Sequence, residues 1–174
     1  MSITKDKPHF LHACLLGILA IGFAMFLSSG LAWDLTAIAS KTILDIANID
    51  SSYSSSIFTV FISLLNGSNI GFMVLAECSG LVSVAIFSFI FVFTIGLLSG
   101  PLLTKITWFI VGICVGLLWN IGRLAFVMGV AYQFGLDAFF WFHYIVGPSI
   151  DFIWVVSVWT LAMSRLRYRK AVSL

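Results

Sequence analysis

Apolar residues in this sequence gather into long runs that are separated by shorter polar segments. The first run extends from Phe10 to Ala32, and residues 81–104 contain no charge. A helix needs roughly 20 predominantly apolar residues to cross a bilayer at about 1.5 Å per residue, and both runs are long enough. The pattern predicts four transmembrane helices at about residues 10–32, 80–98, 102–133 and 142–163, with Trp33 as an interfacial anchor after the first.

The segment between the first two spans, about residues 34–77, has a mixed pattern. Its first half places apolar residues on one helix face, which predicts an amphipathic helix at the membrane surface: Leu35, Ile38, Ile43, Leu44 and Ile46. The serine-rich stretch 51–56 interrupts this helix. Residues 57–65 and 70–75 are rich in β-branched and aromatic side chains and flank the turn sequence Asn-Gly-Ser-Asn, which predicts a β-hairpin. A membrane-inserted segment over 57–75 is the alternative, and the polar turn disfavours it.

The composition supports membrane insertion. Hydrophobic residues make up 61% of the chain and charged residues only 9%, whereas an ordinary soluble domain carries about 25% charged residues. The length of 174 residues suits one membrane domain, which we place over residues 1–174. The predicted fold class is an all-α integral membrane protein with four transmembrane helices, and with the extracytoplasmic amphipathic helix and β-hairpin between helices one and two.

The basic residues predict an orientation. An even number of spans places seven of the nine Lys and Arg residues on one side: Lys5, Lys7, Lys105, Arg165, Arg167, Arg169 and Lys170. The positive-inside rule makes that side the cytoplasm. We therefore expect a multi-pass protein of the cell membrane with both termini in the cytoplasm and the insert 34–77 outside.

The most informative position is Cys78, in the sequence Ala-Glu-Cys-Ser-Gly at the start of the second span. A thiol at a helix N-terminus is a candidate nucleophile, because the helix dipole and the unpaired N–H groups there favour the thiolate. The other cysteines, Cys14 and Cys114, lie within apolar runs, and we expect them to be packing residues. The cysteine spacing fits neither a zinc site nor a disulfide framework, so no metal and no cofactor are expected.

Two further residues are predicted to lie near Cys78 on the outer side. Arg123 lies inside the third span, where an arginine is costly and functional by default. That span is too long for one bilayer, so its outer end is expected to protrude and to raise Arg123. His143 lies at the outer start of the fourth span. A thiol, a guanidinium and an imidazole are thus expected in one layer, on the extracytoplasmic side.

Four polar residues are candidates for binding substrate or supporting this site: Glu77, Ser79, Asn120 and Asp151. Asn120 precedes Arg123 by one helical turn on the same face and can orient the guanidinium or bind a substrate backbone. Glu77 either neutralises Arg123 or is a solvated carboxylate at a helix start. Asp151 lies roughly 12 Å deeper than His143. It either stabilises the fold through a buried hydrogen bond or supports the site.

Three motifs in this order resemble the exosortase and archaeosortase family. They are Ala76-Glu77-Cys78-Ser79-Gly80, Asn120-Ile121-Gly122-Arg123 and His143-Tyr144-Ile145-Val146-Gly147, and the resemblance covers roughly residues 70–155. The chain is shorter than the bacterial members, which carry more spans, so it resembles a minimal version of the family.

The resemblance implies a cysteine-dependent transpeptidase with Cys78, Arg123 and His143 as catalytic residues. It implies membrane-anchored protein substrates whose C-terminal sorting signal comprises a short motif, one transmembrane helix and a basic tail. Cleavage at the motif would pass the new C-terminus to an acceptor nucleophile, a lipid or another anchor. In this chemistry Cys78 forms a thioester, Arg123 stabilises the oxyanion or the thiolate, and His143 transfers protons. No nucleic acid is expected as a partner.

Two other classes of function remain open at this stage. A small transporter or channel subunit would use Arg123 and Asp151 as intramembrane charges. A metal-binding membrane protein would use Cys78, Glu77 and His143. The outer segment, which ends in a hairpin leading to Cys78, suits an enzyme that receives a peptide strand better than it suits a four-helix pore.

Overall fold

The computed structural model describes residues 7–65 and 67–172, which are mostly helical with one small sheet. The helical elements are α1 (Lys7–Leu27), α2 (Gly30–Ile46), α3 (Leu81–Phe91), α4 (Leu102–Phe134), α5 (Leu136–Trp141) and α6 (Gly147–Val172). Two π-helical segments, η1 (Val92–Gly96) and η2 (Phe142–Val146), extend α3 and join α5 to α6. The strands are β1 (Ser51–Ser54), β2 (Thr59–Ser63) and β3 (Asn69–Met73).

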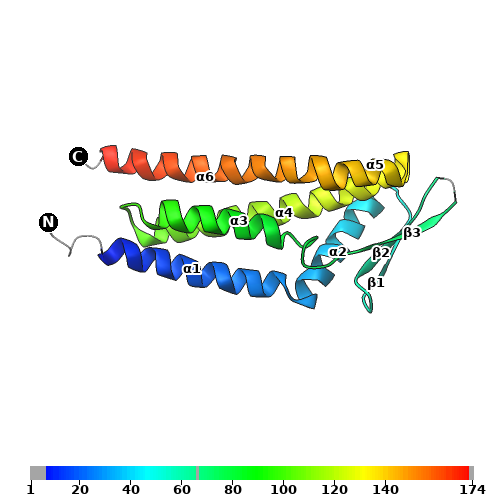
Figure 1. The fold of residues 1–174 in the computed structure, drawn as a ribbon, viewed down its shortest axis with the longest axis horizontal. Helices are drawn as coiled ribbons and strands as arrows, with labels where there is room; N and C mark the ends of the chain where they lie inside the picture. Colours follow the sequence, from blue (N-terminus) through cyan, green and yellow to red (C-terminus); the bar gives the residue numbers. More distant parts are fainter. Residues whose placement is uncertain (1–6, 66, 173–174) are drawn as a thin grey trace.

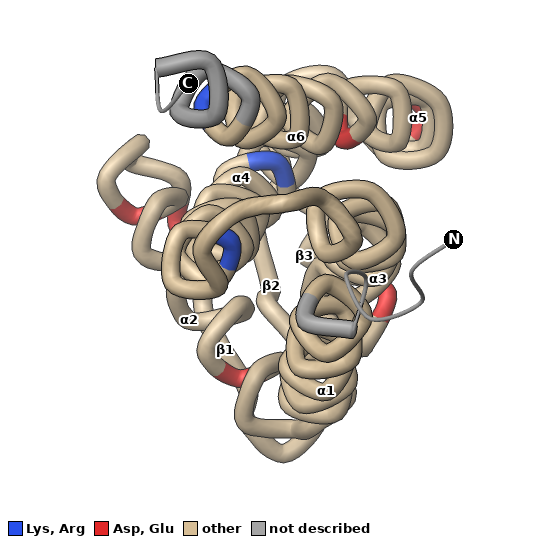
Figure 2. The backbone as a smooth tube through the Cα atoms, turned by 90° about the vertical axis from the view of Figure 1, so that its left-hand side faces the viewer, with Lys and Arg blue, Asp and Glu red and all other residues tan. Residues whose placement is uncertain are grey.

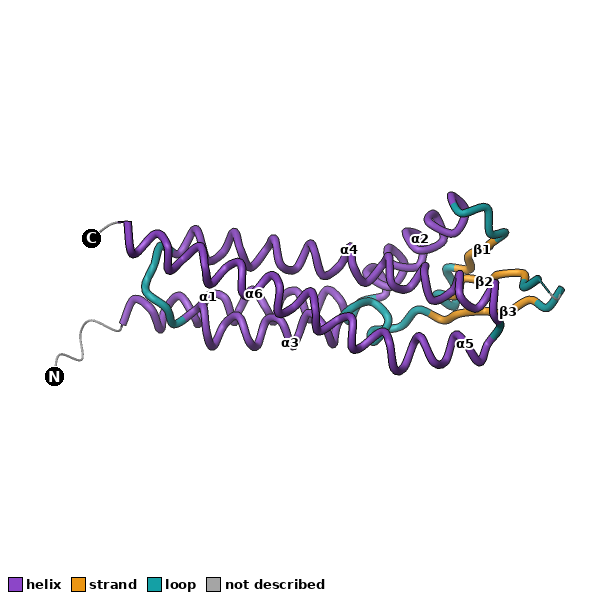
Figure 3. The backbone as a smooth tube through the Cα atoms, turned by 90° about the horizontal axis from the view of Figure 1, so that it is seen from above, coloured by secondary structure: helices purple, strands orange, loops and turns teal. Residues whose placement is uncertain are grey.

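Helices α1, α3, α4 and α6 lie side by side, and α2 and the sheet lie at one end of this bundle (Figure 1). The end-on view in Figure 2 shows that charged residues are sparse along the four helices. Helix α1 begins and α6 ends at the opposite end from the sheet, where the α3–α4 connection also lies (Figures 1 and 3). The bundle therefore has two distinct ends. One carries α2 and the sheet, and the other carries the start of α1, the α3–α4 connection and the end of α6.

Within the described residues, three helical stretches are long and apolar enough to cross a membrane: His9–Leu27, Leu102–Phe134 and Leu136–Leu166. The second predicted span, about residues 80–98, corresponds to the shorter apolar helix Leu81–Gly96, which lies in the same bundle. The membrane character of the chain is thus confirmed, and the count of four spans stays a prediction. Lys5 lies outside the described residues, as do the side chains of Lys7, Arg167, Arg169 and Lys170.

The first helix ends earlier than predicted, at Leu27 rather than near residue 32. The hydroxyls of Ser28 and Ser29 donate to the carbonyls of Ala24 and Phe26 at 2.8 and 2.6 Å. Serine hydroxyls compete in this way for the last carbonyls of a helix, which ends α1 and lets the chain turn into α2. Trp33 therefore belongs to α2, where its indole N–H donates to the Leu27 carbonyl at 2.9 Å.

Helix α2 is present as predicted, and the face that it packs against the protein is largely distinct from its predicted apolar face. Its buried residues are mostly small, namely Ala32, Thr36, Ala37, Ser40 and Leu44, and they allow a close approach to α4. Of the predicted apolar face, only Leu44 is buried, and Leu35, Ile38, Ile43 and Ile46 are exposed. Small residues at helix contacts and large apolar residues facing outward are typical of helices in contact with lipid.

The predicted hairpin is present, and a third strand that the sequence did not indicate extends it. Strand β2 pairs antiparallel with β3 on one side and with β1 on the other, so the order is β1-β2-β3. The serine-rich stretch was expected to be only a break, yet Ser51–Ser54 forms β1. The Tyr53 hydroxyl donates to Asp34 of α2, and burial together with this hydrogen bond raises the pKa of Tyr53 to about 12. A protonated hydroxyl thus joins β1 to α2.

Helix α4 connects the bundle to the sheet. At about 1.5 Å per residue its 33 residues extend about 50 Å, well beyond the roughly 30 Å of hydrocarbon in a bilayer. Its last turns carry Leu124, Met128 and Ala131, which pack with buried residues of α2, β2 and β3. The earlier turns pack in the bundle, where Gly112 lies so close to Phe87 that a Cβ would approach the ring to 2.1 Å.

Lys105, which was expected at the cytoplasmic interface, is completely buried in the first turn of α4. Its ammonium group donates to the carbonyls of Gly96 and Leu98 at 2.7 and 2.5 Å. Gly96 is the last residue of η1 and Leu98 lies just beyond it, where helical carbonyls lack intrahelical partners. Lys105 therefore caps the C-terminal end of the helix formed by α3 and η1.

Candidate active site

The site begins where β3 leads into α3. After β3, the chain passes through Val74 and Leu75 into a turn that contains Cys78, as the sequence predicted for the second arm of the hairpin. The turn ends at Gly80, whose φ of 89° lies in the left-handed region that favours glycine. A Cβ at this position would approach the Asn120 side chain to 3.2 Å. Gly80 thus lets the turn lie directly against α4.

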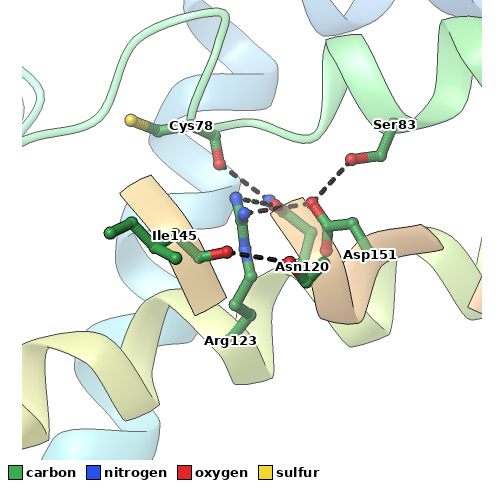
Figure 4. Close-up of polar contacts among 7 residues, drawn as sticks. Cys78, Ser83, Asn120, Arg123, Ile145 and Asp151 are labelled. Carbon is green, nitrogen blue, oxygen red and sulfur yellow. Dashed lines mark hydrogen bonds and ion pairs between the residues drawn. The ribbon is translucent and has the colours of Figure 1, made fainter. Parts of the chain in front are cut away.

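A chain of polar contacts connects this turn to α4 and α6. The Asn120 amide donates to the backbone carbonyl of Cys78 at 2.7 Å, and Arg123 donates to the Asn120 side-chain oxygen at 3.1 Å. The other terminal nitrogen of Arg123 lies 3.0 Å from a carboxylate oxygen of Asp151. The same oxygen accepts the Ser83 hydroxyl at 2.8 Å. Residues from the turn, α3, α4 and α6 are therefore held in one network (Figure 4).

The Arg123–Asp151 ion pair is largely shielded from water, since each side chain retains 13% of its accessible surface. An unpaired guanidinium would be strongly unfavourable in such surroundings, and the carboxylate neutralises it. The carboxylate of Glu77, the other acid considered for this role, forms no ion pair within the described part of the chain. Asp151 rather than Glu77 therefore neutralises Arg123.

The Cys78 side chain is partly buried and takes no part in this network. Figure 4 shows the carbonyl of Cys78 pointing to Asn120 and its sulfur pointing away from the polar contacts. The thiol forms no disulfide, and among the described residues it has no hydrogen-bond partner. The network therefore fixes the backbone of Cys78 and leaves its sulfur free.

A cavity of about 360 Å³ opens beside this network. Its lining includes all three candidate catalytic residues together with Glu77 and Asp151. The remaining lining residues come from α3, η2 and α6: Val82, Ser83, Ile86, Tyr144, Pro148, Phe152 and Val155. Three segments that are far apart in the sequence thus contribute polar side chains to one mostly apolar cavity.

His143 was expected at the start of the last helix but lies inside a continuous helical stretch. It belongs to η2, where its ring stacks on Phe139 at 5.2 Å and meets the edge of Tyr144 at 4.9 Å. A π-helical turn widens the helix locally and is frequent at functional sites. The aromatic neighbours fix the orientation of the imidazole beside the cavity.

Gly147 follows η2 and packs against the guanidinium of Arg123. A Cβ there would lie 3.0 Å from a terminal nitrogen of Arg123 and 3.3 Å from the Phe142 carbonyl oxygen. Gly147 has ordinary right-handed helical angles, so this contact rather than backbone conformation restricts the position. The glycines of two motifs, Gly80 and Gly147, therefore contact Asn120 and Arg123 respectively.

The remaining predicted residues have different outcomes. Ser79 is completely buried, and its hydroxyl lies 2.9 and 2.7 Å from the carbonyl oxygens of Leu27 and Ala76, which share its one hydrogen, so it fixes the turn to the end of α1. Cys14 and Cys114 are exposed on the bundle surface rather than packed inside. Sequence analysis overlooked Ser83, although an isolated serine five residues after Cys78 in an apolar helix was a usable signal.

In residues 7–65 and 67–172, no three His, Cys, Asp or Glu side chains are placed together so that they could hold a metal ion. One carboxylate oxygen of Asp151, Oδ1, is buried and has no hydrogen-bond partner in the same residues. The site thus retains an acceptor atom next to the cavity.

The fold and the site define a helical membrane protein with a polar network beside an open cavity. The model of the transmembrane exosortase family (Exosortase_EpsH) matches residues 8–161, and the chain belongs to this family. Membership supports a transpeptidase-type role in the membrane, with membrane proteins that carry sorting signals as substrates. Comparison with the curated proteins and with the solved structures gives no significant match.

Proposed function

We propose that this protein is a cysteine-dependent transpeptidase that cleaves the C-terminal sorting signal of exported proteins and transfers the new C-terminus to an anchor, a lipid in the simplest case. The observation that carries the proposal is the convergence of a free thiol, a guanidinium and an imidazole on one cavity. Each of these groups has a distinct task in acyl transfer, and the family to which the chain belongs performs this class of reaction.

Cys78 is the nucleophile. Its sulfur attacks the carbonyl carbon of the scissile peptide bond, and collapse of the tetrahedral intermediate forms a thioester and releases the amine of the C-terminal fragment. The Asn120 hydrogen bond to the Cys78 carbonyl supports this role, because it holds the backbone while the thiol remains without a competing partner. Attack by the acceptor on the thioester then completes the transfer and regenerates the thiol.

Arg123 stabilises the oxyanion. A guanidinium has five N–H donors. One donor on one terminal nitrogen binds Asn120, and one donor on the other terminal nitrogen binds Asp151. The remaining donors are available to an oxygen in the cavity that Arg123 lines. Asp151 positions the guanidinium through its ion pair with Arg123.

His143 transfers the protons. It accepts the thiol proton as sulfur attacks and donates it to the leaving amine. It then accepts a proton from the incoming acceptor and returns it to the thiolate as the thioester is broken. Its place at the cavity, with Phe139 stacked on the ring, supports this assignment.

The site is proposed to face the extracytoplasmic side, with both termini in the cytoplasm. The start of α1 and the end of α6 at one end of the bundle, and the sheet at the other, support this orientation (Figure 1). In the transport alternative Arg123 and Asp151 would act as intramembrane charges. Their mutual pairing gives that alternative no particular support.

The proposal is tested by expressing cysteine variants together with a protein that the wild-type chain processes in its host. Cys78→Ala should accumulate the full-length precursor in the membrane. Cys14→Ala and Cys114→Ala are matched controls, because both residues are exposed and neither lines the cavity, and they should process like wild type. Normal processing by Cys78→Ala would end the proposal.

A further inference from the structure

Strand β3 is an edge of the sheet, and its hydrogen-bonding groups alternate between two directions. It pairs antiparallel with β2, and the opposed residues run from Thr59↔Met73 at one end of the strand to Ser63↔Asn69 at the other. The amide of Leu64 bonds to the carbonyl of Ser68, and the amide of Val74 bonds to the carbonyl of Phe58, each at 2.8 Å. Opposed residues alternate between bonded and unbonded pairs in an antiparallel ladder. The even-numbered residues of β3 therefore bond to β2.

The odd-numbered residues direct their backbone N–H and C=O groups away from β2, to the outer edge. These residues are Asn69, Gly71 and Met73, and all three are exposed. In residues 7–65 and 67–172 no other backbone group bonds to this edge. A row of unpaired donors and acceptors is thus available for a further strand.

This edge lacks the devices by which proteins usually prevent strand addition. Residues 69–76 contain no charge and no proline, and both would discourage pairing. Apolar side chains remain accessible beside the edge, with Met73 exposed by 54% and Leu75 by 43%. An unprotected edge with apolar neighbours is typical of a surface that binds an extended peptide through its backbone.

The same edge leads directly to the candidate nucleophile. Cys78 follows Met73 by five residues, which extend at most about 16 Å. On the core face, Phe72 contacts Phe139 with ring centroids 4.8 Å apart, and Phe139 stacks on His143. A peptide that pairs with β3 would therefore continue toward both Cys78 and His143.

We propose that the outer edge of β3 binds the extended segment of the substrate that precedes its membrane helix, as a fourth strand parallel to β3. The inference rests on the proposed function. The direction follows from the chain path, because β3 runs from the tip of the sheet toward the bundle, and so must a substrate that enters the membrane after its cleavage motif (Figure 3). Backbone pairing would fix the register of the motif, and the cavity would then select the side chains at the scissile bond.

A proline at Met73 tests the pairing. The Met73 N–H points away from β2, so Met73→Pro removes a donor of the outer edge without removing a bond of the sheet. Met73→Ala keeps the N–H and tests the side chain alone. Ser51→Pro is the matched control, because the first residue of β1 lies on the opposite edge. We expect Met73→Pro to slow processing at least about tenfold, through the lost hydrogen bond and the steric block, and Ser51→Pro to process normally.

Processing by Met73→Pro at the wild-type rate would overturn the inference. So would an equal loss in Met73→Pro and Met73→Ala, since it would assign the effect to the side chain. A lower thermal midpoint of Met73→Pro in detergent would indicate a folding defect. In that case the cross-linking experiment below, which does not use the proline variant, decides whether the edge binds substrate.

The second measurement uses a photoreactive residue at the edge. Met73→p-benzoylphenylalanine in a Cys78→Ala background should cross-link to the uncleaved tail of a host precursor, whereas Ile57→p-benzoylphenylalanine, exposed in the β1–β2 turn, should not. Cross-linking to a second copy of the chain instead would show that the edge is a dimer contact and overturn the inference. If Cys78→Ala itself processes the precursor, the proposed function fails, whereas failure of the β3 tests alone leaves it intact.

Discussion

Gly147→Ala is expected to separate the catalytic position of Arg123 from protein stability. A Cβ at this position would lie 3.0 Å from the nearest guanidinium nitrogen, and ordinary contact begins near 3.4 Å. The end of the arginine side chain must therefore move by about 0.4 Å, which is cheap for a flexible side chain but comparable to the tolerance of a catalytic geometry. Because the nitrogen concerned is the one paired with Asp151 at 3.0 Å, the shift disturbs the ion pair directly.

Stability should change in the opposite direction. Replacing an interior helical glycine by alanine favours the helix by up to about 1 kcal/mol, and Gly147 already has helical angles. We expect processing to slow about tenfold, equivalent to about 1.4 kcal/mol in the barrier, while the thermal midpoint in detergent is unchanged or higher. Gly122→Ala is the matched control, because nothing lies within 4 Å of a Cβ there. Wild-type processing by Gly147→Ala would refute the requirement for a precisely placed guanidinium.

Four further substitutions test the network and the proton-transfer role of His143. Arg123→Lys should insert into the membrane normally but process the precursor about a hundredfold more slowly or worse, because one ammonium group cannot replace the forked guanidinium that contacts both Asn120 and Asp151. A pulse–chase of the precursor measures the rate. Near-normal processing would remove the oxyanion role. Asp151→Asn should lower the free energy of unfolding by about 3 kcal/mol, since the arginine charge loses its partner. Ser83→Ala should lower it by about 1 kcal/mol, through the lost hydrogen bond to Asp151. Denaturant titration in detergent measures both values. His143→Gln should remove one limb of the pH profile of processing, and an unchanged profile would assign proton transfer to another group.

The sequence was sufficient for the elements that depend on long, uniform patterns. The run from Leu102 to Phe134 forms one helix, and the turn chemistry around Gly67 correctly indicated a hairpin. The site residues were predicted to converge because motifs at the outer ends of different helices share a level in the membrane. The structure places Cys78, Arg123 and His143 around one cavity.

The features that sequence reasoning missed depend on contacts between distant residues. Ser51–Ser54 has no apolar alternation, and its strand forms because β2 offers a free edge for pairing. Ser83 and Asp151 are 68 residues apart, so only the packing of α3 on α6 brings them together. Lys105 is buried because its stem reaches the carbonyls of Gly96 and Leu98, a capping role that charge counting cannot reveal.

The exposed apolar residues of α2 are consistent with a helix at the membrane surface, and the residues that pack it against the protein could not be read from the apolar pattern. Large apolar residues predict a buried face only where the surroundings are water, since the hydrophobic effect then drives burial. Next to lipid, the large residues can face outward while small ones allow close helix contact. The buried positions Ala32, Ala37 and Ser40 follow the second rule.

The central claim is that Cys78 forms a thioester with the substrate, and mass spectrometry of the trapped enzyme tests it most directly. The purified chain would be incubated with an uncleaved C-terminal segment of a host precursor in detergent or lipid, quenched in acid and digested. The account predicts an acyl adduct on the peptide that contains Cys78, with the mass of the substrate segment ending at the cleavage site, and its release by hydroxylamine. Processing that proceeds with no adduct on Cys78, or with an adduct on Cys14 or Cys114, would contradict it.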